Sequence, residues 1–305
     1  MLKEILVPLD GSALAEEVLP YAASLAKGLK TRIVLLHIID AENLRVEAGE
    51  HRAYLDQLQQ SAEAAASGYL EEQAKPLTAL GISVSTSVVY GKAADVLAAY
   101  GEGQPEPDTL IALSTHGRSG LARTALGSVA DRLLRAAHAP LLVIHPRDGA
   151  GEPLAELRRI MVPLDGSPLA EAVLPLVSQL ARAMNLGVSL VWVVQIASQV
   201  YGPPELVVYP AELLQEMQQM AVSYLQRTLD GLKRDGVGDA EFEVMLHNAP
   251  AIAITDRARA IDGALLAMST HGRSGFTRWM LGSVTDHVVR MSGVPVLVVR
   301  PPQPA

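Results

Sequence analysis

The sequence predicts an α/β protein built from two tandem doubly wound domains, each with an open, parallel, five-stranded sheet. Apolar runs typical of buried strands alternate with longer segments of helical periodicity. The apolar residues are mostly Val, Leu, Ile and Ala, and aromatic residues make up only 4% of the chain, which suits parallel strands covered by helices. The third observation is an internal repeat with a constant offset of 155 residues.

Four motifs of the first half recur in the second half at this one offset. They are Val7–Ser12 and Val162–Ser167, Ser114–Gly120 and Ser269–Gly275, Leu126–Val129 and Leu281–Val284, and Pro140 and Pro295. A single offset shared over so long a stretch indicates a duplicated domain. We therefore expect a first domain over residues 1–146, a linker over 147–157 and a second domain over 158–301.

Within the first repeat, strands and helices are expected to alternate along the chain. The expected strands are Glu4–Leu9, Arg32–Ile39, Ser83–Tyr90, Thr109–Leu113 and Pro140–Ile144, and the helices are Leu14–Leu29, Arg52–Leu80, Ala93–Tyr100 and Ser128–Ala137. Pro20 and its counterpart Pro175 leave two alternatives for the first helix, which either kinks at the proline or begins near it. After the third strand Gly91 is matched by Asn248, which predicts a positive φ at both positions.

Composition and charge exclude several classes of function. Residues 1–150 carry 13 Lys and Arg against 18 Asp and Glu, and residues 151–305 carry 12 against 15, so neither half has the basic excess of a nucleic-acid-binding domain. The absence of cysteine excludes disulfides and thiolate chemistry. The sequence contains no run of about 18 apolar residues, so no membrane span is predicted. Because no segment resembles a signal peptide, the expected location is the cytoplasm.

The segment after the fourth strand is the strongest candidate for a ligand site, because open parallel sheets bind ligands beyond the carboxyl ends of their strands. Gly117 allows a close approach of the backbone to a ligand. After a nine-residue spacer, Gly127 and Ser128 open a helix that Ser128 is placed to cap, and the N–H groups and dipole of that helix favour a phosphate. The alternative is that these residues only form a turn and a helix cap.

Polar residues near the same edge of the sheet have two interpretations each. Asp10 either contacts the ligand or is a turn residue that caps the first helix. His116 and His271 are candidate acid–base groups, but no second such group and no metal ligand lies at a recognisable spacing, so we expect loop histidines near a phosphate. Arg118 and Arg273 either contact phosphate or are solvated charges of the loop. No metal site is predicted.

Together these motifs resemble those of the universal stress protein family over almost the whole of both repeats. The resemblance rests on the Val-Pro-Leu-Asp-Gly-Ser opening, the Ser-Thr-His-Gly loop, the nine-residue spacer before Gly-Ser-Val, and the final strand that begins with Pro. It implies the strand order 3-2-1-4-5 in each domain. For the ATP-binding members of the family it also implies the pattern G-x-x-G, nine residues, then G-[S/T].

Site residues follow from the resemblance by matching the motifs position by position. On the adenine side they are Pro8, Asp10, Ile38 and Leu113 in the first repeat, and Pro163, Asp165, Val193 and Met268 in the second. On the phosphate side they are Gly117, Gly127, Ser128 and Val129, and then Gly272, Gly282, Ser283, Val284 and Thr285. Both repeats depart from the family pattern at its first glycine, where Ser114 and Ser269 stand near the expected path of the ribose.

The resemblance implies a regulatory, ATP-binding stress-response protein that is non-catalytic or hydrolyses ATP very slowly. AMP, ADP and magnesium-bound ATP are alternatives for the cofactor. A stress-associated interaction protein that binds no nucleotide is the alternative function, and a slow ATPase or nucleotidyl-transfer enzyme is a third. We expect ATP rather than NAD or nucleic acid, because neither repeat contains a GxGxxG loop followed by an acidic residue that would read a ribose.

The two repeats are expected to differ in affinity. Thr285 offers a hydroxyl to a phosphate where the first repeat has Ala130, which favours the second repeat as the better site. Opposing this, Trp192 replaces His37 and is expected to crowd the neighbourhood of Val193.

In this family single domains commonly pair through their last strands, so we expect the two halves to form an intramolecular pseudo-dimer. The apolar runs Pro140–Ile144 and Pro295–Val299 are edge strands that would otherwise invite aggregation. Fusion of the two domains raises the effective concentration of one edge at the other. A homodimer of the whole chain is a further expectation.

Overall fold

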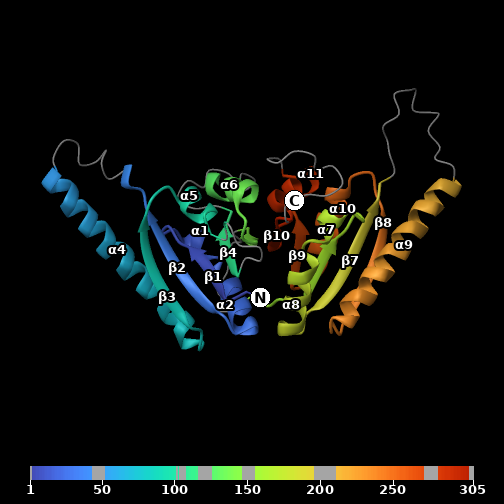
Figure 1. Cartoon of the computed structure of the whole chain (residues 1–305), viewed down its shortest axis with the longest axis horizontal. Coiled ribbons are helices and arrows are strands. Elements are labelled where there is room, and N and C mark those ends of the chain that lie inside the picture. The colour runs from blue at the N-terminus through green and yellow to red at the C-terminus, as the bar shows by residue number, and fades with distance from the viewer. Residues whose placement is uncertain are drawn as a thin grey trace, which may run out of the picture. The chain divides into compact units, whose positions relative to one another are not determined.

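The computed structural model describes residues 2–42, 52–100, 102, 108–115, 126–145, 155–195, 211–270 and 281–301. The chain divides into two units, Met1–Glu156 and Leu157–Ala305. The division therefore falls at the end of the segment that the sequence assigns to a linker. In each unit helices pack against a sheet of parallel strands (Figure 1), which confirms the predicted α/β class and the tandem repeat.

Unit 1 has the predicted strand order. Its elements are β1 (Glu4–Pro8), α1 (Ala13–Glu16), α2 (Leu19–Leu29), β2 (Arg32–Ile39), α4 (Arg52–Ala79), β3 (Val84–Tyr90), α5 (Ala93–Ala98), β4 (Thr109–Ser114), α6 (Ser128–Ala136) and β5 (Leu141–Ile144). The order in the sheet is β3-β2-β1-β4-β5, and all four pairings are parallel. The order reverses between β1 and β4, which is where a doubly wound sheet leaves a crevice for a ligand.

Unit 2 repeats this arrangement. Its elements are β6 (Arg159–Pro163), α7 (Pro168–Glu171), α8 (Leu174–Met184), β7 (Gly187–Val194), α9 (Ala211–Arg234), β8 (Ala240–Leu246), α10 (Pro250–Arg259), β9 (Ala264–Ser269), α11 (Ser283–Met291) and β10 (Val296–Val299). Its strand order is β8-β7-β6-β9-β10, again with parallel pairings. The corresponding crevice lies between β6 and β9.

The central strands form the core of each unit. Ile5, Leu6 and Val7 of β1 are completely buried, as are their counterparts in β6. Long helices cover the outer strands of each sheet, with α4 on β2 and β3 and α9 on β7 and β8. Burial of the central strands on both faces explains why their sequences read as continuous apolar runs.

The prolines near the first helix mark where a helix begins. A short helix, α1, ends at Glu16, and α2 starts at Leu19 with Pro20 in its first turn. Pro175 occupies the same place in α8. A proline is tolerated there because its missing N–H has no intrahelical acceptor in the first turn. Of the two alternatives left by the sequence, the second is correct.

The prediction of a positive φ at Asn248 is wrong. Gly91 has a φ of 148°, but the non-glycine residues with positive φ in the described part of the chain are Lys30 and Asn185. Both follow the last residue of a helix, α2 and α8, and adopt the left-handed conformation with φ 54°. This conformation ends a helix by turning the next backbone N–H back onto a free carbonyl.

Candidate functional site

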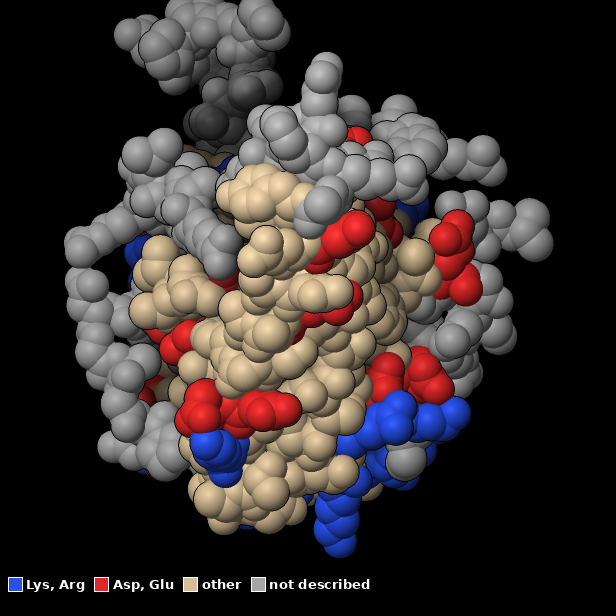
Figure 2. Space-filling view, turned by 90° about the vertical axis from the view of Figure 1, so that its left-hand side faces the viewer, with Lys and Arg blue, Asp and Glu red and all other residues tan. Residues whose placement is uncertain are grey.

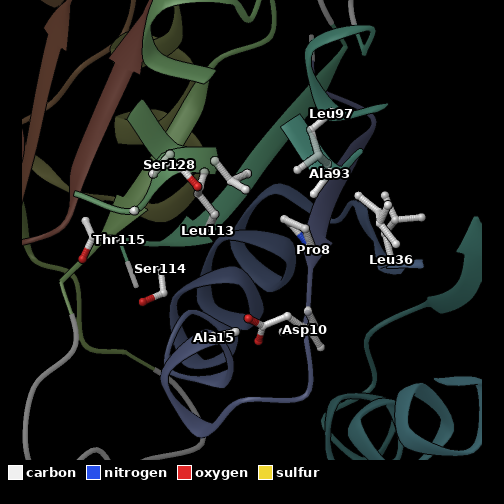
Figure 3. A pocket seen from close by; sticks show the side chains of 15 residues that line it. Pro8, Asp10, Ala15, Leu36, Ala93, Leu97, Leu113, Ser114, Thr115 and Ser128 are labelled. Atoms are coloured by element: carbon white, nitrogen blue, oxygen red, sulfur yellow. The ribbon is translucent and has the colours of Figure 1, made fainter. Parts of the chain in front are cut away.

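A cavity of about 240 Å³ lies at the carboxyl ends of the strands of unit 1, at the crevice between β1 and β4. Figure 3 shows side chains from strands β1, β2 and β4 and from helices α1, α5 and α6 converging on it. The sequence-predicted residues that line it are Pro8, Asp10, Ile38, Leu113, Ser114, Gly127, Ser128 and Val129. Gly117, together with His116 and Arg118, lies outside the described residues.

Unit 2 has a larger cavity of about 600 Å³ in the equivalent place. The sequence-predicted residues that line it are Pro163, Asp165, Val193, Met268, Ser269, Gly282, Ser283, Val284 and Thr285. Gly272, His271 and Arg273 lie outside the described residues. In both units, therefore, every predicted residue that the structure describes lines one cavity.

The other lining residues were not among the predicted contacts, although Ala130 and Trp192 are named from the sequence as differences between the two sites. In unit 1 they are Leu9, Ala15, Leu36, Ala93, Leu97, Thr115 and Ala130, and in unit 2 they are Leu164, Ala170, Val191, Trp192, Val194, Gln195, Met217, Met220, Pro250 and Ile254. Part of this set has a periodic signal. Leu36 precedes Ile38 by two residues on the same face of β2, and Ala93 and Leu97 are four residues apart on one face of α5.

The aspartate after the first strand organises a tight loop in each unit. Oδ1 of Asp10 accepts hydrogen bonds from Ser12 N at 3.0 Å and Ser12 Oγ at 2.6 Å. Oγ of Ser12 in turn accepts a hydrogen bond from Ala15 N and caps α1. Asp165 makes the same contacts with Ser167 in unit 2. The turn role that the sequence offers for Asp10 is therefore present, and the carboxylate also lines the cavity.

In each unit the cavity is bounded at one end by the start of a helix, and the N-cap of that helix is not the predicted residue. Gly127, not Ser128, is the N-cap of α6, and no side chain caps this helix. Gly282 is likewise the N-cap of α11, again without a side-chain cap. Ser128 and Ser283 are the first helical residues and are exposed. An uncapped first turn leaves backbone N–H groups and the positive end of the helix dipole available for an anion.

Gly127 also has a purely structural reason to be glycine. Its N–H donates a hydrogen bond of 2.8 Å to the carbonyl of Thr115. A Cβ on Gly127 would lie 2.8 Å from the same carbonyl oxygen, which is too close. Gly282 makes the equivalent hydrogen bond to Thr270 at 2.9 Å. The glycine is thus required by the fold, with or without a ligand.

The two units differ in the hydroxyl groups at the end of the fourth strand. Oγ of Ser114 is buried and has no hydrogen-bond partner among the described residues. In unit 2, Thr285 is only 4% exposed and its Oγ1 donates a hydrogen bond of 2.9 Å to the carbonyl of Ser269. The expectation that the Thr285 hydroxyl is available to a phosphate is therefore wrong, because the hydroxyl already donates its hydrogen bond to the backbone of Ser269.

Contrary to expectation, Trp192 does not crowd the second site. It is 8% exposed and packs edge-to-face on Tyr224, with ring centroids 5.2 Å apart. His37 packs on Tyr69 in the same manner at 6.3 Å. The unit with the larger aromatic side chain has the larger cavity.

A tyrosine and a glutamate join the long helix to the first short helix in each unit. Oη of Tyr69 donates a hydrogen bond of 2.9 Å to Glu16, and Oη of Tyr224 donates one of 2.7 Å to Glu171. Burial, and then the neighbouring carboxylate, raise the pKa of both tyrosines well above the ordinary value. These pairs fix the position of α4 and α9 relative to the aspartate loops.

Within the described ranges no group of three His, Asp or Glu side chains is arranged to hold a metal ion. Nor does the described part of the chain contain a helix with the length and apolar character needed to cross a membrane.

Comparisons with known proteins agree with this architecture. The sequence model of the universal stress protein family matches the chain twice, over residues 1–145 and 156–300. A universal stress protein of Mycobacterium tuberculosis is 32% identical over 191 residues, which cover 63% of this chain and 61% of that relative. The match thus spans less than two thirds of the relative's length. A universal stress protein of Mycolicibacterium smegmatis is 26% identical over 306 residues, and the match covers 97% of this chain and 97% of that relative.

Solved structures show the same fold. The crystal structure of a universal stress protein from Archaeoglobus fulgidus has a TM-score of 0.70 at 20% identity, covering 97% of this chain and 98% of that one. A protein from Pseudomonas aeruginosa, described as a putative universal stress protein, has a TM-score of 0.59 at 17% identity, covering 98% and 94% of the two chains. At such identities the likeness concerns the fold alone.

Proposed function

This chain belongs to the universal stress protein family, and from that premise we propose that each of its units binds an adenine nucleotide, with ATP as the preferred ligand. The observation that carries the proposal is the shared position of the predicted residues. In each unit they come from separate elements and surround one cavity that ends at an uncapped helix.

The residues present fit the parts of an adenine nucleotide in unit 1. Pro8, Ile38 and Leu113 supply apolar surface for the base, and Asp10 supplies an acceptor for its amino group or for a ribose hydroxyl. The buried Oγ of Ser114 has no hydrogen-bond partner in the described part of the chain, so it is a group that a ligand hydroxyl would satisfy, and an unsatisfied buried hydroxyl is otherwise costly.

The phosphates of the nucleotide fit the start of α6. A cavity of about 240 Å³ is smaller than the roughly 300–1,000 Å³ of typical small-molecule pockets. It suits a nucleoside whose phosphates lie outside the cavity over the exposed Ser128. The N–H groups of the first helical turn and the helix dipole favour negative charge there.

We propose a regulatory rather than a catalytic role. The cavities are lined by apolar side chains, hydroxyl groups and one aspartate each, with the amide of Gln195 in unit 2, a set suited to holding a nucleotide. The slow-ATPase alternative makes a distinct prediction, since it requires release of inorganic phosphate that stops when Asp10 and Asp165 are both replaced by Asn.

The charge distribution favours a small-molecule ligand over nucleic acid. In Figure 2, on the face that carries α4, the basic side chains lie beside acidic ones in separate groups, and a wide uncharged surface lies between the groups. The chain carries 25 Lys and Arg against 33 Asp and Glu, and net negative charge repels a phosphate backbone. We place the protein in the cytoplasm, where such a site would read the ATP pool.

The direct test is to identify what the purified protein carries. The full chain is heat-denatured, and the released small molecules are separated by ion-exchange chromatography and quantified against protein. We expect adenine nucleotide in a substantial fraction of chains. The apo protein should then bind ATP more tightly than NAD or a single-stranded RNA in calorimetry. Absence of released nucleotide together with no binding of ATP would favour the alternative function, a stress-associated interaction protein without a nucleotide.

A further inference from the structure

The cavities of the two units differ on the side that faces the long helix. In unit 2 the cavity is lined by Trp192 of β7 and by Met217 and Met220 of α9. The offset of 155 residues places His37, Ala62 and Ala65 at the equivalent positions of unit 1. The contacts of Tyr69 with Glu16 and of Tyr224 with Glu171 confirm that α4 and α9 share this register.

None of the three equivalents in unit 1 lines its cavity. The replacement of small alanines by long methionines would ordinarily fill space, yet the cavity of unit 2 measures about 600 Å³ against about 240 Å³ in unit 1. The cavity of unit 2 therefore extends over β7 towards α9. We call this part, lined by Trp192, Met217 and Met220, the apolar extension.

The last residue of the outer strand adds to the difference. The strand register pairs Ile39 with Tyr90 in unit 1 and Val194 with Leu246 in unit 2, so that Tyr90 and Leu246 are equivalent. Oη of Tyr90 lies 3.5 Å from a backbone carbonyl of α4 and joins the strand to the helix. Leu246 has no hydroxyl for such a contact and is 40% exposed. The end of β3 is thus joined to α4 by a polar contact in unit 1 that Leu246 cannot make in unit 2.

Met220 is not a core residue, since it is 63% exposed. Burial in the fold therefore does not explain a methionine at this position. Methionine side chains are flexible and polarisable and adapt to apolar ligands, and aromatic side chains supply a large flat surface for the same purpose. The apolar extension therefore has the composition of a ligand-binding surface.

We propose that unit 2 binds an adenine nucleotide that carries an apolar group on its base, and that this group occupies the apolar extension. The inference rests on the proposed function. Val193 of the predicted adenine side lines the same cavity as Trp192. The two residues are consecutive in β7, so their side chains point to opposite faces of the sheet and the cavity passes around the carboxyl end of this strand. The start of α11, on the predicted phosphate side, follows β9, which β6 separates from β7 in the sheet. A substituent on the base reaches the apolar extension, and a substituent on the phosphates does not.

The test compares ATP with two analogues in the full-length protein. N6-benzyl-ATP and 8-benzylthio-ATP carry an apolar group on two different edges of the adenine. Titrations use the Asp10→Asn background, which weakens unit 1 so that unit 2 is observed. We expect at least one analogue to bind about tenfold more tightly than ATP, the scale on which a pocket senses an added apolar group.

Two variants locate the gain in affinity. The change Met217→Ala with Met220→Ala should return the affinity for the analogue to that for ATP, while the affinity for ATP itself stays the same. Met220→Gln alters an exposed helical position without disturbing the core, and should lower the affinity for the analogue several-fold even if the double variant does not fold. Leu213→Ala is the matched control, because Leu213 is an exposed apolar residue of α9 that does not line the cavity.

The outcomes separate the two proposals. If ATP binds but neither analogue binds more tightly, the apolar extension is not a ligand subsite and the proposed function stands. If the gain persists in Met220→Gln and in the double variant, the inference is equally overturned. If neither ATP nor an analogue binds, the proposed function fails and the inference fails with it.

Discussion

The hydroxyl of Thr285 donates a hydrogen bond of 2.9 Å to the backbone carbonyl of Ser269 and thereby joins the start of α11 to the end of β9. The first unit has Ala130 at the position of Thr285 and makes no such contact through that side chain. The hydroxyl therefore stabilises the unit that contains it, which is a different role from contacting a phosphate.

Replacement of Thr285 by Val should destabilise unit 2 by about 1–2 kcal/mol, because a buried hydrogen bond to the carbonyl of Ser269 is lost. Urea denaturation followed by circular dichroism measures this change. The affinity for ATP should change by less than about threefold, well under the tenfold that corresponds to about 1.4 kcal/mol. A large loss of affinity with unchanged stability would instead place the hydroxyl on the ligand.

Replacement of Ser114 by Ala should have opposite effects on stability and on binding. Without ligand, removal of a buried hydroxyl that no described residue contacts by a hydrogen bond should leave stability unchanged or raise it by up to about 1 kcal/mol. With ATP, the variant should bind more weakly in unit 1. Ser178→Ala is the control, because Ser178 also has a buried hydroxyl without a partner among the described residues but does not line either cavity. Equal affinities in both variants would remove Ser114 from the site.

Replacement of Tyr224 by Phe should reduce the dependence of stability on alkaline pH. The folded protein holds the pKa of Tyr224 above its ordinary value through burial and the nearby Glu171. As the pH rises past about 10, an unfolded tyrosine loses its proton first. The stability contributed by this group is therefore complete below that pH and is lost as the pH rises through the folded-state pKa.

The measurement is the midpoint of urea unfolding at pH 8 and pH 11 for wild type and variant. At pH 8 the variant should be less stable by about 1 kcal/mol, because a hydrogen bond to a half-exposed carboxylate is lost. The difference should shrink at pH 11. Tyr69→Phe is the matched change in unit 1, and a difference that stays constant with pH would contradict the account.

The predicted pseudo-dimer has its own test in the two edge strands β5 and β10, which are the last strands of their sheets. If these apolar strands pair, the backbone amides of Leu141–Ile144 and Val296–Val299 should be protected from hydrogen exchange on both sides of each strand. Outward-facing amides that exchange as fast as those of an exposed loop would show that the strands do not pair.

Much of the fold follows from the sequence because its signals are local. The strand Arg32–Ile39 has the predicted bounds, since a continuous apolar run leaves little freedom in a parallel sheet. The start of α2 at Leu19 does not follow from the sequence, because Pro20 is compatible both with a kinked helix and with a helix that begins near it. Residue preference alone favours Ser128 as the cap of α6, whereas the close contact with Thr115 selects Gly127 for that position.

The site, too, contains residues that the sequence predicts and residues that it does not. Motif residues such as Pro8 and Asp10 are found from the sequence because they follow strand ends, where a parallel sheet gathers its ligand contacts. Met217 and Met220 carry no motif, and their relation to the cavity depends on how α9 lies over β7. That relation is fixed by the contact between Tyr224 and Glu171, a pairing across 53 residues that periodicity does not reveal.

The central claim, that each unit holds one adenine nucleotide, is tested most directly by isothermal titration of the apo protein with ATP, alongside Asp10→Asn, Asp165→Asn and the double variant. Asparagine keeps the oxygen that Ser12 or Ser167 requires and removes the charge of the acceptor. We expect two ATP per wild-type chain, one tight site in each single variant and none in the double variant, with each change weakening its site about tenfold to a hundredfold. Wild-type stoichiometry of zero, or two sites unaffected by either substitution, would contradict the account.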